Sequence, residues 1–562
     1  MPEPKDPAFQ LSAQLVDDFS KLCPVQASMA GVPGAWDGWD DYSAEGGIKV
    51  RALLASYRTR LDALPAATER WAKLARRVMA DFLEEKDVYF AHGDNLCDLN
   101  NIESPLQHMR VVFDVMDTTG VVGWSALAKR LETIDQPLAG YRAALETGAA
   151  RGLVPARRQV RACIVQSKAH ASESSSYLAL LTSFDAAKID DASLRARIAS
   201  GIDHARDAFR DFGGFLESFL ERATPDDAFG AERYARAAFR FNGMKIDPVD
   251  TYAWGFTEVR SIEAAMQELS HRIAPGKSTR EVVDALSTSE TELVRDHEKF
   301  LELMRARQQR ALDDLEGKHF DVPAPIRRIE VKLAPAGTAL GAYYIPPNED
   351  FSRPGTVFYA PAPGHEFALF SEITTAYHEG FPGHHLQCGL QVFLSERLSR
   401  LHRLFVVCSG YAEGWALYAE QLMDELGYFE KPEYLLGMHM AKLFRACRVV
   451  VDIGVHHGYA IPKDFDFHPG EVWNYELAVE FLTTRGLIPR PFAESEATRY
   501  LGWPGQAISY KVGERVILDL RREMRERLGD RFDLRKFHEA VLSSGSVGLD
   551  LLREIVHESL DA

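Results

Sequence analysis

Apolar residues recur every three or four positions through the first 320 residues, and charged residues fall between them. This spacing collects the apolar side chains on one face of a helix, so it predicts a mostly helical segment. Ser278 and Glu281 stand in the order of a capping box, in which each side chain bonds the backbone at the start of a helix. A long charged helix is predicted from Ser289 toward Leu315.

The pattern changes after residue 320, where short β-rich runs are bounded by proline and glycine. These runs predict the strands of a small sheet and cover residues 329–333, 342–345 and 356–359. Helical spacing returns at residues 367–379 and again from residue 395 to the end. The helix 367–379 therefore follows the predicted sheet directly.

These patterns predict a mainly α protein with a small sheet before one particular helix. No internal repeat and no low-complexity linker separates the segments, so helical lobes around a central cleft are favoured over independent modules. We place the boundary near residue 320, between an N-terminal lobe at 1–320 and a C-terminal lobe at 321–562.

Composition narrows the class of protein. The 562 residues are 46% hydrophobic and 26% charged, which is typical of a folded globular chain. The formal net charge of -17 disfavours nucleic acid and anionic membranes as partners. The six cysteines form no CxxC pair, and the N-terminus lacks the apolar run of a signal peptide, so a cytoplasmic location is expected. The oligomeric state does not follow from these features.

The run from His378 to His385 holds metal-binding residue types in an unusual order, His-Glu-Gly-Phe-Pro-Gly-His-His. In the common HExxH motif, two histidines leave one helix face and bind one zinc ion. Pro382 stands at the second histidine position here. On an ideal helix, His384 would point about 120° away and His385 would lie roughly 10 Å along the axis. A break at Pro382 and Gly383 would bring one of the two histidines back, and both remain candidates.

A carboxylate ligand is expected from a second helix. Glu413 and Glu420 are seven residues apart, so both carboxylates lie on one helix face about two turns apart. One of them can bind a metal ion while the other supports a ligand.

Three segments resemble the domain-of-unknown-function 885 family of bacterial proteins. They are HExxPGHHxQ from His378, EGWALYxE from Glu413 and PGQAxSYKxG from Pro504. The order of an HE helix followed by a glutamate helix is also similar to the gluzincin peptidases, including the thimet oligopeptidase and carboxypeptidase Taq types.

This resemblance implies a role for each residue of the motif. His378 and a following histidine would be zinc ligands, Glu413 the carboxylate ligand and Glu379 the general base. His384 is preferred over His385 because the step from Gly383 to His384 looks like the end of an HExGH motif with two residues inserted. His385 stays the alternative second ligand.

Further residues acquire expected roles from the same resemblance. Tyr510 and His456 are candidates to stabilise an oxyanion beside the metal. Edge strands before the metal helix of gluzincins pair with substrate backbone, which would place Tyr343 and Tyr344 beside the substrate. The remaining candidates would support ligands or bind substrate, and they are Glu420, Arg448, Asp452, Arg499 and Lys511. The competing interpretation is that these residues form buried ion pairs and core contacts.

The expected function is a zinc-dependent metallopeptidase with one zinc ion per chain, a peptide substrate, and Glu379 as the base that takes a proton from a zinc-bound water. Another divalent metal also suits a His/His/Glu site. Two alternatives stay open: a non-peptidase zinc hydrolase of an ester or amide, and a catalytically silent helical binding protein in which the inserted Pro-Gly has dismantled the metal site. The sequence does not distinguish amino-, carboxy- and endopeptidase modes.

Overall fold

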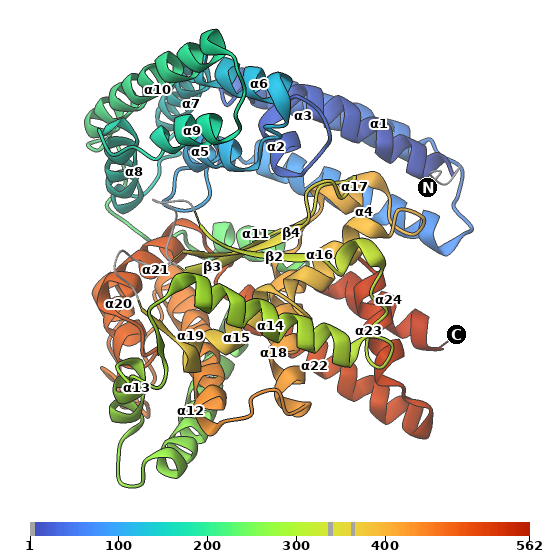
Figure 1. Cartoon of the computed structure of the whole chain (residues 1–562), viewed down its shortest axis with the longest axis vertical. Helices are drawn as coiled ribbons and strands as arrows, with labels where there is room; N and C mark the ends of the chain where they lie inside the picture. Colours follow the sequence, from blue (N-terminus) through green and yellow to red (C-terminus); the bar gives the residue numbers. More distant parts are fainter. Residues whose placement is uncertain (1–5, 335–340, 361–365, 562) are drawn as a thin grey trace. The chain divides into compact units, whose positions relative to one another are not determined.

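The structure is a computed structural model that describes residues 6–334, 341–360 and 366–561 (Figure 1). Helices dominate and the strands form only small sheets, which confirms the predicted mainly α class. The chain divides into two compact units. Unit 1 contains Met1–Asp227, Asn348–Asp350 and Ser395–Val406, and unit 2 contains Ala228–Pro347, Phe351–Leu394 and Val407–Ala562. In the part of the chain that the structure describes, no helix combines the length and the apolar character needed to cross a membrane.

Unit 1 is helical and packs around apolar side chains from most of its helices. The long helix α10 lies against α6, α7, α8 and α9, where residues such as Leu127, Tyr141 and Ile198 are fully buried. The elements of unit 1 are α1 Pro7–Leu22, α2 Pro24–Met29, α3 Ala44–Asp62, α4 Arg70–Ala91, η1 Asp94–Leu96, α5 Pro105–Val115, α6 Gly120–Glu132, α7 Asp135–Ala150, α8 Arg157–Ala171, α9 Leu178–Ala186, α10 Ala192–Phe219 and α17 Arg400–Phe405.

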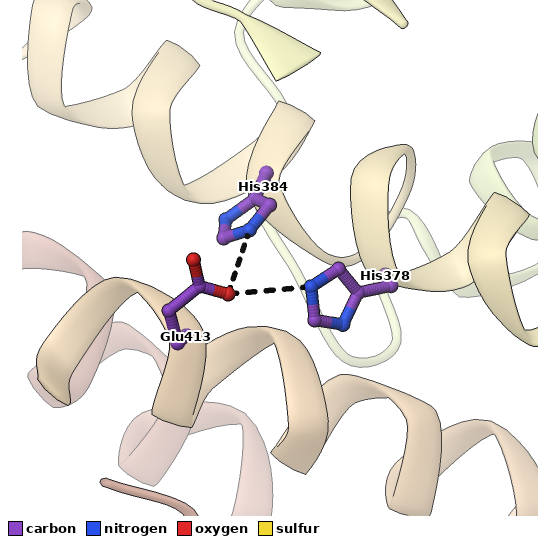
Figure 2. Close-up of side chains that lie close together, drawn as sticks. All are labelled: His378, His384 and Glu413. Carbon is purple, nitrogen blue, oxygen red and sulfur yellow. Dashed lines mark ion pairs between the residues drawn. The ribbon is translucent and has the colours of Figure 1, made fainter. Parts of the chain in front are cut away.

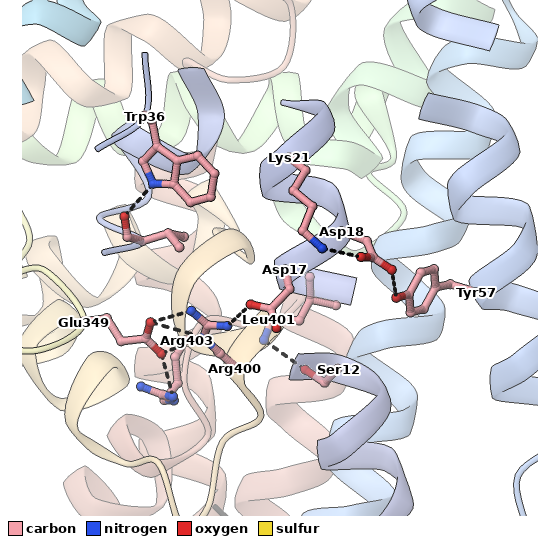
Figure 3. A network of polar contacts seen from close by, with 11 residues as sticks. Ser12, Asp17, Asp18, Lys21, Trp36, Tyr57, Glu349, Arg400, Leu401 and Arg403 are labelled. Atoms are coloured by element: carbon pink, nitrogen blue, oxygen red, sulfur yellow. Dashed lines mark hydrogen bonds and ion pairs between the residues drawn. The ribbon is translucent and has the colours of Figure 1, made fainter. Parts of the chain in front are cut away.

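A polar network explains why two late segments of the chain belong to unit 1 (Figure 3). The Arg400 guanidinium donates to both carboxylate oxygens of Glu349, at 2.9 to 3.1 Å, and also bonds Asp17 on α1. Arg403 donates to the same Glu349 carboxylate at 3.2 Å. The Ser12 hydroxyl accepts the backbone N–H of Leu401 at 2.9 Å. Glu349 therefore joins two arginines of α17, and α17 in turn bonds α1.

Removing the charge of Glu349 is expected to destabilise the protein strongly. The Glu349 and Arg403 side chains are only 16% and 6% exposed, so Glu349→Gln removes a carboxylate shared by two arginines in a poorly hydrated place, while Arg400 keeps its bond to Asp17. We expect the free energy of unfolding to fall by about 3 kcal/mol. The control is Lys21→Ala, which removes the exposed pair with Asp18 in the same network and should change stability by less than about 0.5 kcal/mol. Equal melting curves for the two variants would contradict this assignment.

Unit 2 contains the helices that carry the candidate motifs. The long helices α12 and α19 run side by side, and α18 packs closely against α22 (Figure 1). The helices of unit 2 are α11 Ala231–Asn242, α12 Pro248–Ile273, α13 Thr279–Ser287, α14 His297–Leu315, η2 Ala324–Ile326, α15 Leu369–Glu379, α16 His384–Phe393, α18 Ser409–Glu425, α19 Pro432–His457, α20 Tyr475–Thr484, α21 Arg490–Gly502, α22 Ser509–Leu528, η3 Gly529–Arg531, α23 Leu534–Ser543 and α24 Leu549–Asp561.

Two small sheets also belong to unit 2. One has the strand order β2-β4-β3, with β2 parallel and β3 antiparallel to β4, and the other pairs β1 with β5. The strands are β1 Leu293–Val294, β2 Ile329–Leu333, β3 Gly341–Ile345, β4 Gly355–Ala360 and β5 Phe367–Ala368. The three predicted strands are thus confirmed as β2, β3 and β4, and α15 follows the sheet as predicted.

Of two helix starts predicted from the sequence, one is confirmed and the other lies further along the chain. The capping box at Ser278 and Glu281 is formed in both directions at the start of α13. The helix predicted from Ser289 begins later, at His297, because Asp296 caps it through Lys299 N–H and residues 293–294 pair with β5 as strand β1.

The boundary predicted near residue 320 lies inside unit 2 and differs from the division seen in the structure. The helices before that boundary bury their apolar faces against elements after it, since α12 lies along α19 and α14 packs on β2 and α15. The spacing of apolar residues shows which face of a helix is buried, but it does not show which other element packs against that face.

Candidate metal centre

The chain breaks between α15 and α16, as the Pro-Gly step predicts. α15 ends at Glu379, and a turn at residues 380–383 separates it from α16, which begins at His384. The Trp415 indole N–H donates to the backbone oxygen of Pro382 at 2.9 Å, so α18 holds the turn in place. A Cβ at Gly383 would stand 2.0 Å from the backbone oxygen of His378, so only glycine fits there. The break turns His384 back toward His378.

The imidazoles of His378 and His384 and the carboxylate of Glu413 converge (Figure 2). One ligand atom from each residue lies within 4.8 Å of the others. Glu413 Oε2 is 3.3 Å from His378 Nε2 and 3.4 Å from His384 Nε2. The two rings are 4.9 Å apart and almost perpendicular, at 85°. This arrangement aims three donor atoms at one point.

The orientation of His378 is set by Glu420, one carboxylate of the predicted pair. His378 Nδ1 donates to Glu420 Oε1 at 2.7 Å, and the Thr374 hydroxyl bonds the other carboxylate oxygen. The Glu420 side chain is fully buried. When His378 carries a single proton, this bond places the proton on Nδ1, and the lone pair of Nε2 then points toward Glu413 and His384. A buried carboxylate behind a ligand imidazole is the usual support of a zinc-binding histidine.

The electrostatics of the site favour a positive charge. Burial alone would lower the pKa of His378, but the carboxylates of Glu413 and Glu420 overcome it and raise that pKa to about 9. Burial would raise the pKa of Glu413, but the two histidines hold it well below its ordinary value. Glu413 Oε2 is buried and has no hydrogen-bond partner among the residues that the structure describes. Two histidines and one carboxylate are a set of three ligands that suits zinc with one coordination position left for water.

His385 faces away from the three converging side chains. Its Nε2 donates to the backbone oxygen of Ile326 at 2.7 Å, and its Nδ1 lies 3.1 Å from the Tyr344 hydroxyl on β3. Burial lowers the pKa of His385 to about 4, which keeps the ring neutral. Both ring nitrogens are therefore used in packing the sheet against α16, and His384 is the histidine that the structure brings to His378.

Two further candidates lie beside the converging side chains. Glu379 follows His378 directly, is 9% exposed, and its carboxylate has no hydrogen-bond partner in the described ranges. The Tyr510 ring, at the start of α22, lies parallel to the His378 ring at 6.4 Å. Burial and the charge of Glu413 raise the pKa of Tyr510, so its hydroxyl keeps its proton.

Other predicted residues are engaged elsewhere in unit 2. His456 uses both ring nitrogens on backbone, accepting from Phe229 N–H at 3.2 Å and donating to the Tyr500 oxygen at 3.1 Å. These bonds leave His456 no nitrogen for an oxyanion, contrary to the expected role. Lys511 forms ion pairs with Glu514 and with Glu258, the latter at 3.0 Å.

Asp452 is fully buried and accepts the Tyr234 hydroxyl at 2.7 Å and the Gly505 N–H at 3.0 Å. Burial raises the pKa of Asp452 to about 7. The Tyr343 ring on β3 stacks on Phe358 at 5.2 Å. The structure gives both residues packing contacts, in line with the competing structural interpretation.

Arg448 and Arg499 share one counter-ion. Arg448 on α19 donates to Glu496 Oε2 at 3.0 Å, and Arg499 pairs with Glu496 Oε1 at 3.2 Å. Sequence reasoning missed two neighbours of these sites, Thr374 and Arg445. Each shares a helix face with a residue that was recognised, since Thr374 precedes His378 by four positions and Arg445 precedes Arg448 by three. That spacing is the signal by which they could have been found.

The position of Glu413 depends on a close approach of α18 and α22. A Cβ at Gly513 would stand 1.8 Å from the backbone oxygen of Gly410. Gly513→Ala should therefore push α18 aside, lower the free energy of unfolding by about 1–3 kcal/mol and weaken metal binding. Gly214→Ala is the control, because nothing lies within 4 Å of a Cβ there and alanine favours the interior of α10. Thermal melts and metal titration of both variants test this prediction. Wild-type stability and wild-type metal affinity in Gly513→Ala would contradict it.

Comparisons with known proteins agree on a family. The chain matches the family described as bacterial protein of unknown function (DUF885) over residues 24–556. Its structure is similar to that of a "putative lipoprotein" from Colwellia psychrerythraea, with 26% identity, a TM-score of 0.87 and 99% of each chain covered. A "putative lipoprotein of unknown function" from Shewanella oneidensis has the same fold, at 19% identity and a TM-score of 0.70, with 97% of this chain and 98% of that chain covered. No curated protein matches.

The family match includes the three motifs that carry the converging side chains, at His378, Glu413 and Pro504. It also reaches well into the helices of unit 1, so the resemblance is not limited to the C-terminal motifs. The chain belongs to the DUF885 family of bacterial proteins of unknown function.

Proposed function

We propose that this protein is a zinc-dependent peptidase whose metal ligands are His378, His384 and Glu413. One observation carries the proposal: three ligand atoms lie within 4.8 Å of one another, with the buried Glu413 Oε2 facing a nitrogen of His378 at 3.3 Å and a nitrogen of His384 at 3.4 Å. Two imidazoles and one carboxylate brought together in a buried place are the ligand types that bind zinc, and a cation between them would satisfy all three.

The chain's own residues have distinct roles in this proposal. A bound zinc ion would supply Lewis acidity toward a water molecule and a peptide carbonyl. Glu420 orients His378 through Nδ1. The Glu379 carboxylate takes the proton of the attacking water and delivers it to the amine that leaves. The Tyr510 hydroxyl, held in its neutral form, donates a hydrogen bond to the oxygen that gains negative charge.

The relationship to gluzincin peptidases belongs to the same proposal. It is supported by the order of the elements, with the His378-Glu379 helix first and the Glu413 helix second, and by the small sheet that precedes them. In this proposal β3, an edge strand of the sheet, would pair with the backbone of an extended peptide. The proposal also includes a cleft around the metal centre that would hold the peptide.

The experiment is cleavage of a mixed peptide library by the zinc-loaded protein, followed by mass spectrometry. New peptide termini that disappear after metal removal and return with zinc would support the proposal. Cleavage of simple aryl esters with no peptide products would favour the non-peptidase hydrolase. A protein that takes up no zinc and cleaves neither substrate class would favour the silent binding protein.

A further inference from the structure

A group of three arginines near Tyr510 shares the carboxylate of Glu496. Arg445 and Arg448 occupy one face of α19, and Arg499 lies on α21. Glu496 pairs with Arg448 at 3.0 Å and with Arg499 at 3.2 Å. Burial raises the pKa of Glu496, and the charges of Arg499, Arg448 and, more weakly, Arg445 lower it below its ordinary value. Arg448 and Arg499 thus pair with Glu496 directly, and the charge of Arg445 acts on the same carboxylate.

The group has more hydrogen-bond donors than acceptors. Arg448 is 5% exposed, yet its Nε and Nη1 have no partner among the residues that the structure describes. The Nε atoms of Arg445 and Arg499 are likewise buried without a partner in the described ranges. Buried donors left unpaired are costly, and buried guanidinium groups more so. A second anion would satisfy them.

A purely structural charge cluster in the same unit looks different. There, Lys442 and Lys511 face Glu258 and Glu514, with distances of 3.2 Å for Lys442 to Glu514 and 3.0 Å for Lys511 to Glu258. That cluster balances two positive charges with two negative charges. The arginine group places three positive charges around Glu496, and the other carboxylate near Arg445, that of Glu420, bonds His378, so the group has the excess of positive charge expected of an anion-binding site.

Tyr510 connects the arginine group with the proposed metal centre. The Arg448 guanidinium carbon stands 4.6 Å from the centre of the Tyr510 ring, and the same ring lies 6.4 Å from the His378 ring. An extended peptide advances about 3.3–3.6 Å per residue. A carboxylate held by Arg448 would therefore belong to a residue close to the bond that is cleaved, within about two residues of it.

We propose that Arg448, Arg499 and Arg445 form a subsite that binds a carboxylate of the peptide substrate next to the scissile bond. The reaction at that bond rests on the proposed function, whereas the binding of the carboxylate does not. Guanidinium groups bind carboxylates through charge-assisted hydrogen bonds, and Nε and Nη1 of Arg448 are donors without a partner among the described residues. The carboxylate comes from the free C-terminus of a peptide or from an acidic side chain, and the test below separates the two.

The first arm of the test measures cleavage. Three matched peptides are compared with the zinc-loaded protein: a free acid, its C-terminal amide, and an amide with an aspartate at the last position. We expect the free acid to exceed the neutral amide in kcat/KM by on the order of 10- to 100-fold. Preference for the aspartate amide over the neutral amide, but not for the free acid, would assign the subsite to side chains. Equal rates for all three peptides would overturn the proposal.

Variants connect the preference to the arginines. Arg445→Gln leaves Glu496 paired with Arg448 and Arg499, so the protein should fold. The ratio of kcat/KM for the free acid to kcat/KM for the neutral amide should fall severalfold, toward a value of one. Arg448→Lys keeps the charge but loses the paired donors and should reduce the preference further. Arg522→Gln is the matched control, because Arg522 is 65% exposed and pairs only with Asp519 at 2.8 Å among the described residues; it should keep the full preference.

The second arm measures binding alone. Calorimetry measures the dissociation constants of benzoylglycine and benzoylglycinamide for the wild type and for Arg445→Gln. Both proteins are zinc-loaded, so any direct contact of the carboxylate with zinc contributes equally to the two proteins. We expect benzoylglycine to bind about tenfold more tightly than the amide in wild type, with most of that difference lost in Arg445→Gln. An Arg445-dependent difference without any peptide cleavage would sustain the subsite and refute the proposed peptidase. No difference would overturn the subsite even if peptides are cleaved.

Discussion

Replacing Glu379 by Gln is expected to lower kcat by roughly 10²- to 10⁴-fold while the protein still binds zinc. The amide keeps the shape of the side chain but cannot accept a proton from water. Since Glu379 is not among the three converging ligands, metal content should stay at the wild-type level. Peptide cleavage is measured at saturating substrate, and zinc is measured on the same sample.

Glu298→Gln is the matched control, because Glu298 is an exposed residue in the first turn of α14. It should retain wild-type turnover. Full activity in Glu379→Gln would refute the role of Glu379 as general base, whereas loss of both zinc and activity would mean that Glu379 supports the metal site itself.

Removal of the metal is expected to abolish cleavage and to lower the melting temperature of the wild-type protein by a few degrees. A ligand that binds only the folded state stabilises it by about 2.7 kcal/mol at a hundredfold excess over its dissociation constant. Without the ion, the buried carboxylate of Glu413 faces only the two histidines. Scanning calorimetry with and without a chelator measures the shift, and added zinc should reverse it.

Glu413→Ala tests whether that shift comes from the proposed site. The variant lacks the carboxylate shared by His378 and His384, so its melting temperature should not respond to chelation or to added zinc. A chelator effect as large as in wild type would place the stabilising ion elsewhere in the protein.

Local features of the candidate site could be predicted from the sequence. The three strands and the helix before His378 follow from short-range alternation and periodicity, and the break at residues 380–383 follows from the chemistry of proline and glycine. The pairing of Glu413 with Glu420 on one face needed only a spacing of seven residues.

Long-range contacts could not be predicted in this way. The direction of His384 after the break depends on the bond from Trp415 to Pro382, which joins positions 33 residues apart. His385 is held away by Ile326 and Tyr344, and no pattern near His385 shows this. His456 resembled a catalytic residue because its motif did, but its two nitrogens bond the backbone of residues distant in the sequence. Role assignments fail where a side chain's partner lies far along the chain.

Family membership supports the fold and leaves the chemistry as a proposal. The similarity to the Colwellia psychrerythraea protein covers 99% of both chains, so the arrangement of helices within each unit has a precedent in a solved structure. The cytoplasmic location remains a prediction from the N-terminal residues, and the two structural neighbours are described as lipoproteins. The proposal of peptidase activity rests on the candidate metal centre alone.

Elemental analysis of purified protein tests the metal centre most directly. Wild type, His384→Ala and His385→Ala are purified in metal-free buffer, incubated with zinc, dialysed and measured by mass spectrometry. We predict close to one zinc per chain in wild type and in His385→Ala, and a large loss in His384→Ala, because only His384 of this pair converges with His378 and Glu413. Equal zinc in the two variants, or none in wild type, would contradict the proposed site.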